Sequence, residues 1–214
     1  MEQKSSSKPF WLTLLFVVLQ VFFVFTLVSP QVLEDNMLKE VSYLDETFGK
    51  KATDNIVMKA TNNTDYLFYE SGFYGTLRGW IFPKEFLESR VIEDRYFDTE
   101  FWIAIDNVLI GVSYNIQFIL LRIYGLFPWA ALSIIITTAS IISGYLQREV
   151  KKHGFEYSSP LKHGLAKRAI YFTPIIFVLF LIFPFAIPTE IAPIFVVFIS
   201  IAISFVISNT IKRV

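Results

Sequence analysis

The chain has 214 residues, of which 54% are hydrophobic and 18% are charged, and its formal net charge is zero. Its mean hydropathy of +0.51 is typical of membrane proteins and excludes an ordinary soluble domain. Zero net charge excludes a global field that would attract nucleic acid or acidic substrates, so any electrostatic role must be local. Cysteine is absent, which excludes disulfides, thiol nucleophiles and thiolate metal sites.

Four apolar runs are long enough, or nearly so, to cross a bilayer core of roughly 30 Å, which needs about 20 helical residues. They occupy residues 10–29, 126–146, 170–187 and 191–211. The first run contains Gln20 as its only strongly polar residue, and we expect it to be an uncleaved anchor because its apolar core exceeds that of a signal peptide. Only residues 188–190 separate the last two runs, which predicts a helical hairpin. Pro174 and Pro184 are expected to kink its first helix.

The fold class that follows is an all-α polytopic membrane protein with four transmembrane helices. A mainly helical extracytoplasmic domain is expected over residues 30–125, between the first two spans. Apolar residues at helical spacing, with carboxylates between them, predict an amphipathic helix over residues 32–48. The aromatic side chains between Tyr66 and Phe86 fit either a small core or a position at the membrane surface.

Residues 103–121 are apolar enough to suggest a fifth span, but they carry a polar stripe. Asp106, Ser113 and Gln117 recur at i, i+7 and i+11, and such side chains are costly in lipid. We therefore predict an amphipathic helix that leads through Arg122, at the membrane interface, into the span at 126–146.

The charge distribution predicts the orientation of the chain. The termini, residues 1–9 and 212–214, and the loop 147–169 lie on one side of four spans and hold ten of the 19 basic residues. The opposite side holds 16 of the 19 acidic residues. Because positive charge favours the cytoplasm, both termini and the loop are expected there, and a fifth span would place the loop outside.

The loop 147–169 admits four interpretations. In the first, the loop sets the orientation of the chain and contacts anionic lipid headgroups, which would account for its charge. A nucleic-acid site is less favoured because Phe155 and Tyr157 are its only rings. His153 and His163 lie ten residues apart without a ligand partner at helical spacing, so neither a metal nor another cofactor is expected. The fourth interpretation is a docking surface for a cytosolic partner.

No sequence motif for catalysis is present. The chain contains no phosphate loop or nucleophile elbow, and the four runs contain no ionisable residue of the kind that marks a transport pathway. Small residues instead recur at i+4 spacing, which allows helices to approach closely. We expect helix packing within the monomer, or alternatively a dimer face, at Ser140, Gly144, Ser200, Ser204 and Ser208.

The stretch "SGYLQREVKKHGFEYSSPLKHGLAKRAI", followed by an apolar hairpin and "SNTIKRV", resembles the TraJ-like inner-membrane proteins of conjugative plasmids and integrating conjugative elements. The order of anchor, long extracytoplasmic loop and basic loop extends the resemblance over most of the chain. It implies a non-enzymatic component of a type IV secretion system in the bacterial inner membrane. The implied partners are the coupling ATPase that delivers DNA and other inner-membrane subunits.

The resemblance suggests that the basic loop docks this ATPase. The residues expected to carry the contact are Arg148, Lys151, Lys152, Lys167 and Arg168. One alternative is a small membrane enzyme or transporter with an extracytoplasmic site, whose polar groups would be Asp94, Asp98, Glu100 and Asp106. A membrane assembly factor is the other alternative. Direct contact with nucleic acid is not expected, whereas homo-oligomers are compatible with the small-residue stripes.

Overall fold

The structure is a computed structural model that describes residues 15, 18–19, 28–89, 99–154 and 159–210. All secondary structure in these residues is helical. The chain divides into two compact units, and each is described by itself. The first comprises residues 1–124 together with Leu181–Ile187, and the second comprises Gly125–Phe180 and Pro188–Val214.

Three helical segments in the described residues are long and apolar enough to cross a membrane: Thr99–His153, Leu161–Ile182 and Ile191–Ser208. They include or overlap the three predicted spans after residue 125, and they indicate a membrane protein. The span predicted at residues 10–29 lies outside the described residues, except for Leu15, Val18, Leu19, Val28 and Ser29.

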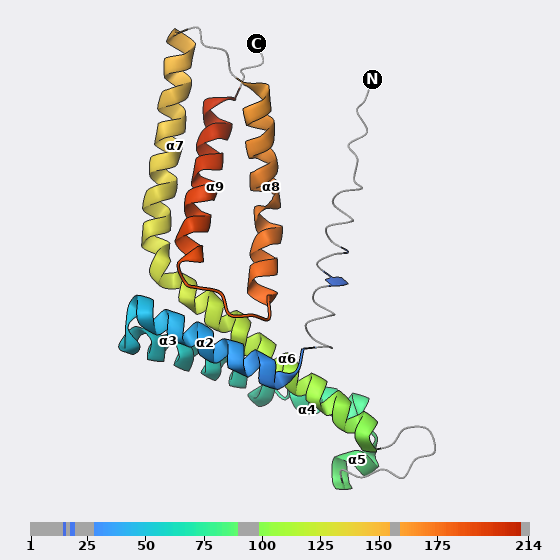
Figure 1. Ribbon diagram of the computed structural model, residues 1–214. Helices are drawn as coiled ribbons and strands as arrows, with labels where there is room; N and C mark the ends of the chain where they lie inside the picture. Colours follow the sequence, from blue (N-terminus) through green and yellow to red (C-terminus); the bar gives the residue numbers. More distant parts are fainter. Residues whose placement is uncertain (1–14, 16–17, 20–27, 90–98, 155–158, 211–214) are drawn as a thin grey trace, which may run out of the picture. The chain divides into compact units, whose positions relative to one another are not determined.

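The first helix of the first unit, α2 (Pro30–Phe48), begins and ends where the sequence provides capping residues. The Ser29 hydroxyl accepts a hydrogen bond from the Val32 amide at 3.4 Å, and Pro30 fits the first turn. The helix ends at Gly49, whose φ of 79° lies in the left-handed region that glycine adopts readily. The next helix, α3 (Lys50–Thr64), lies beside α2 (Figure 1).

A first hydrophobic core joins α2, α3 and α6 (Thr99–Leu126). Its buried residues are Leu33, Leu44, Ile56, Ala60, Phe118 and Leu121. Of the amphipathic helix predicted at residues 32–48, the apolar side chains Leu33, Met37, Val41, Leu44 and Phe48 lie in or against this core, whereas Val32 and Leu38 are exposed. Removal of these side chains from water is the main stabilising contribution that the pattern predicts.

The polar stripe predicted on α6 is directed at protein groups of the same unit. Ser113 accepts a hydrogen bond from the Tyr69 hydroxyl at 3.0 Å, and the Gln117 amide donates to the Thr61 hydroxyl at 2.9 Å. Asp106 pairs with Arg78, as described below. Each stripe residue thus has a polar partner, which removes the cost of an unpaired buried group.

A second core lies against the N-terminal half of α6. Besides α6, α4 (Phe73–Ile81) and α5 (Lys84–Ser89) contribute to it, and the π-helix η1 (Asp65–Glu70) packs against α4 through the Phe68 and Tyr74 rings. Its centre is Phe82, Phe86 and Leu109, with the two phenyl rings stacked at 5.1 Å. The aromatic cluster of this region is divided, because Phe68 is buried with Phe82 and Phe86, whereas Tyr66, Phe73 and Trp80 are exposed.

In the second unit, α7 (Ala130–His153) and α9 (Ile191–Ser208) lie side by side (Figure 1). A Cβ atom added to Gly144 would lie 2.8 Å from the Ser204 carbonyl oxygen, so the backbones meet where only glycine fits. Thr137 and Ser200 share a hydroxyl hydrogen bond of 3.3 Å, and Ser200 and Ser208 are buried. Gly144, Ser200 and Ser204 thus lie at the contact between α7 and α9, and Ser140 is half-buried.

The helix α8 (Pro160–Ile182) differs from the predicted span in both bounds. It ends five residues before position 187, because Pro184 disfavours helical backbone at the residue that precedes it. It begins inside the predicted loop 147–169, and α7 extends to His153. Most of the basic stretch is therefore helical. The short 3₁₀ turn η2 (Phe127–Trp129) precedes α7, and Ser159 precedes α8.

Candidate functional site

The five basic residues predicted to bind a partner lie at two helix ends of the second unit. Arg148, Lys151 and Lys152 lie in the last two turns of α7, and Lys167 and Arg168 lie in the second and third turns of α8. Arg148 and Lys151 are half-buried, whereas the other three are exposed. We refer to these positions, with the exposed Lys162, as the basic helix ends.

Lys151 is bound within the unit. Its ammonium group donates to the Asn209 side-chain oxygen at 3.0 Å and to the Ser208 carbonyl at 3.4 Å. A cation is stabilised there, because the C-terminus of α9 carries partial negative charge. The same Asn209 oxygen accepts a hydrogen bond from the Ser159 amide at 3.2 Å. Asn209 therefore connects the ends of α7 and α9 with the start of α8, and Lys151 contributes to that connection.

The remaining cations of the basic helix ends differ in their partners. Lys152 forms an ion pair with Glu149, one turn earlier on α7, and both side chains are partly exposed. Such a pair is worth little in water, so Lys152 can exchange its partner. Lys162, Lys167 and Arg168 have no carboxylate partner in the part of the chain that the structure describes. These three present the free positive charge of this surface.

The two histidines do not form a metal site with other described residues. The His163 Nδ1 atom lies 3.3 Å from the Val206 carbonyl oxygen, whereas His153 is exposed. Among the described residues, no group of three His, Cys, Asp or Glu side chains is arranged to hold a metal ion. The two rings of the nucleic-acid interpretation, Phe155 and Tyr157, lie outside the described residues.

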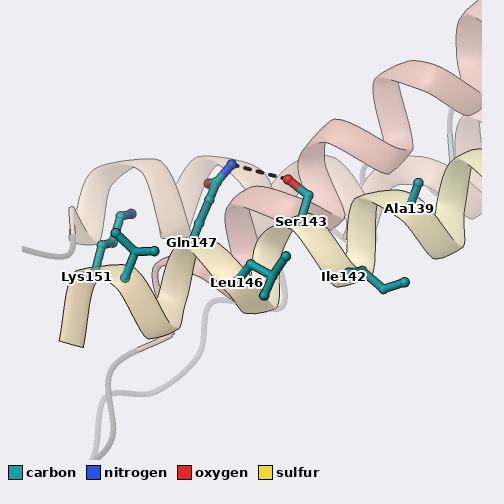
Figure 2. A pocket seen from close by; sticks show the side chains of 7 residues that line it. Ala139, Ile142, Ser143, Leu146, Gln147 and Lys151 are labelled. Atoms are coloured by element: carbon teal, nitrogen blue, oxygen red, sulfur yellow. Dashed lines mark hydrogen bonds between the residues drawn. The ribbon is translucent and has the colours of Figure 1, made fainter. Parts of the chain in front are cut away.

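A surface groove of about 720 Å³ follows α7 toward Lys151. Figure 2 shows Ala139, Ser143 and Gln147 at i+4 intervals, with Gln147 donating to the Ser143 hydroxyl at 3.4 Å. The groove is lined mainly by apolar groups and ends at a cation that Asn209 already holds. It therefore provides no additional charged group to the basic helix ends.

A buried ion pair in the first unit was not predicted from the sequence. The Arg122 guanidinium is fully buried and makes a bidentate contact with Glu40, with N–O distances of 2.8 and 2.9 Å. It also lies 4.2 Å from the centre of the Phe118 ring. Charge-assisted bidentate pairs of this kind are strong and geometrically specific.

The same guanidinium binds the last turn of α8 and the segment that follows it. It donates to the carbonyl oxygens of Leu181, Phe183 and Phe185 at 3.2, 2.6 and 2.8 Å. Its five N–H groups thus all have acceptors. The Glu40 carboxylate in turn accepts a hydrogen bond from the Ile187 amide at 3.1 Å. This arrangement, which we call the Arg122 clamp, satisfies the backbone groups that become unpaired where α8 ends.

The sequence contains one signal for the clamp. Arg122 is the only charged residue between positions 107 and 147, and a lone charge in an apolar helix requires a partner. Glu40 gives no such signal, because other carboxylates surround it on an amphipathic helix. The turn carbonyls cannot be recognised at all, because they depend on α8 ending at Ile182.

A second ion pair fixes α4 to α6. Asp106 lies 3.3 Å from the Arg78 Nε atom, a contact that lacks hydrogen-bond geometry, and 3.4 Å from the Arg78 Nη2 donor. The Tyr74 hydroxyl donates to Asp106 at 3.4 Å. Burial, and then the negative charge of Asp106, raise the pKa of the Tyr74 phenol. Tyr74 therefore stays neutral and serves as a donor.

The carboxylates of the enzyme or transporter alternative are not gathered around a common site in the described residues. Asp106 is used in the pair with Arg78, and Glu100 is exposed in the first turn of α6. Asp94 and Asp98 lie outside the described residues.

The comparisons with known proteins give one match. A family model described as "IncC plasmid conjugative DNA transfer protein DtrJ-like" matches residues 24–213. No curated protein and no solved structure matches the chain.

Proposed function

This chain belongs to the DtrJ-like family of IncC plasmid conjugative DNA transfer proteins, and from that premise we propose that it docks the coupling ATPase of the secretion machinery at the membrane. The docking surface is the set of basic helix ends, and the role is binding without catalysis. The proposal requires these ends to lie in the cytoplasm, as the distribution of basic residues predicts.

The observation that carries the proposal is the free charge at the start of α8. Lys167 and Arg168 are adjacent, exposed and without a carboxylate partner in the described part of the chain. Lys162 adds a third exposed cation five residues earlier. A rigid helix that presents uncompensated charge suits an acidic partner surface, since complementary charge accelerates association and fixes orientation.

From the contacts within the second unit, we expect the five predicted residues to differ in role. Lys151 is held by Asn209 and is expected to support the surface without contacting the ATPase. Lys152 must release Glu149 before it binds a partner. Lys167 and Arg168 are therefore expected to contribute most, with Arg148 and Lys152 at the edge of the contact.

The test is charge reversal at the two leading positions. We expect Lys167→Glu with Arg168→Glu to abolish both co-purification with the ATPase and plasmid transfer. A matched control reverses Lys50 and Lys51, which are likewise adjacent, helical and exposed but lie in the first unit. Equal loss of transfer in both double variants would attribute the effect to net charge and reject the docking surface.

Charge reversal near a span can also change membrane orientation, so orientation requires its own measurement. The chain has no cysteine, and a single cysteine introduced at Lys162 reports the side on which this position lies. Labelling with a membrane-impermeant thiol reagent should require permeabilised cells in both double variants. Plasmid transfer that is retained in a correctly oriented double variant of Lys167 and Arg168 would contradict the proposal. If the basic helix ends bind anionic vesicles but not the ATPase, their role is lipid contact and the proposal is also rejected.

A further inference from the structure

The helix α4 has two faces of different chemistry. Tyr74 and Leu77 pack against the second core, as do residues of α5 and α6. Phe73 and Trp80 lie seven residues apart, hence almost two full turns, and so share one side of the helix, at the edge of the packed face and next to Leu77. Trp80 is 83% exposed and Phe73 is 49% exposed. The outward side of α4 thus presents the Trp80 ring and about half of the Phe73 ring, whose other part lies against Phe68.

This outward side carries no charge. Arg78 is the only charged residue of α4, and its side chain is turned toward Asp106 with 22% of its surface exposed. Its guanidinium lies 5.5 Å from the ring centres of both Tyr74 and Phe82. Gly75 and Gly79 are open, since an added Cβ atom would meet nothing within 4 Å at either position. The surface therefore consists of rings, backbone and the Thr76 hydroxyl.

The π-helix η1 exposes further apolar side chains, together with the carboxylates of Asp65 and Glu70. Tyr66 is 63% exposed and Leu67 is also exposed, while the Phe68 ring between them and α4 lies 5.8 Å from the Phe73 ring. Tyrosine and tryptophan combine an apolar ring with one polar group, and both are enriched where the hydrocarbon of a bilayer meets water. We call Tyr66, Leu67, Phe73 and Trp80 the aromatic face.

We propose that the aromatic face lies in the headgroup region of the lipid bilayer, with Trp80 as its main anchor. The chain carries three helices suited to cross a membrane, so a bilayer adjoins every copy. The outer sides of α2 and α3 differ, because they expose charged residues such as Glu34, Lys51 and Asp54. On α4 the aromatic face has no exposed charged residue, whereas on η1 the exposed Asp65 and Glu70 border it. This inference is independent of ATPase docking.

The test uses the fluorescence of Trp80 in the full-length chain, reconstituted in vesicles of phosphatidylethanolamine and phosphatidylglycerol. The other three tryptophans, Trp11, Trp102 and Trp129, are replaced by phenylalanine. We expect a spin label near the lipid headgroup to quench Trp80 more than a label near the end of the acyl chain. We also expect its emission to be blue-shifted and its quenching by iodide to be low.

The control moves the reporter to the charged side of the unit. Trp80→Phe with Met58→Trp places the only tryptophan at an exposed position of α3, where iodide should quench it and lipid labels should not. Trp102 packs against the second core, and its replacement must leave the chain folded. If it does not, the fluorescence of the unmodified chain minus that of its Trp80→Phe variant reports Trp80 alone. Three results would overturn the proposal. Strong quenching of Trp80 by iodide would place it in water, and quenching mainly by the deep label would place it in the hydrocarbon core. Quenching by neither iodide nor the lipid labels would indicate that a protein partner covers it.

Discussion

The two compact units of this protein are held together by different interactions. In the first unit, helices are joined by apolar cores and by two ion pairs, the buried pair of Arg122 with Glu40 and the partly buried pair of Arg78 with Asp106. In the second, α7 and α9 meet through Gly144 and hydroxyl side chains, and in the residues that the structure describes a charged group contributes only at their ends. Apolar burial drives helices together in water but not in lipid, where close backbone contact must replace it. The difference is thus one of contact chemistry: apolar burial and ion pairs in the first unit, and close backbone packing of the kind found between membrane helices in the second.

The strongest test of this comparison is removal of one partner of the Arg122 clamp. Arg122→Met should destabilise the protein by about 3–5 kcal/mol, because it leaves the Glu40 carboxylate buried without its cation. It also leaves the carbonyls of Leu181, Phe183 and Phe185 without their donors. Thermal unfolding in detergent, followed by tryptophan fluorescence, measures the loss of stability.

A double variant separates the charge from the packing. Arg122→Met with Glu40→Met removes both charges and should recover much of the stability that the single variant loses, since apolar replacements of a buried pair are often tolerated. A double variant as unstable as Arg122→Met alone would mean that the carbonyl contacts after α8, and not the buried charge, dominate the clamp.

The second test addresses the close helix contact of the second unit. Gly144→Ala should destabilise by about 1–3 kcal/mol, because the new Cβ atom would lie 2.8 Å from the Ser204 carbonyl oxygen and the helices must separate. Gly164→Ala in α8 is the matched control, since its Cβ atom meets nothing within 4 Å. The control should be neutral or stabilising by up to about 1 kcal/mol through helix propensity. Equal effects at both glycines in the same unfolding measurement would reject a close contact in solution.

The helical fold class and the apolar segments after residue 125 could be predicted, because composition and periodicity act locally along the chain. The same holds for the stripe of Asp106, Ser113 and Gln117, whose common direction follows from helical spacing alone. Their partners could not be predicted, because Tyr69 and Thr61 lie 44 and 56 residues earlier. The Arg122 clamp depends on an even longer separation, 82 residues to Glu40.

The site shows the same limit. Sequence identifies the basic residues of positions 148–168, but it treats them as equivalent cations in one loop. Only the positions of Asn209 and Glu149 distinguish a lysine that is bound within the unit from Lys167 and Arg168, which are not. The distinction arises from where α7, α8 and α9 end, and helix ends are set by capping contacts that a periodic pattern does not contain.

The smallest expected effect comes from Asn209, the polar connection at the ends of the second unit. Asn209→Ala removes acceptors for the Lys151 ammonium and the Ser159 amide, and should destabilise by about 1 kcal/mol. If Lys151 only supports the basic helix ends, this variant should retain co-purification with the ATPase while unfolding slightly earlier. If co-purification instead increases, the released Lys151 is a direct contact. The variant therefore tests, at one residue, whether the charge of the second unit serves packing or recognition.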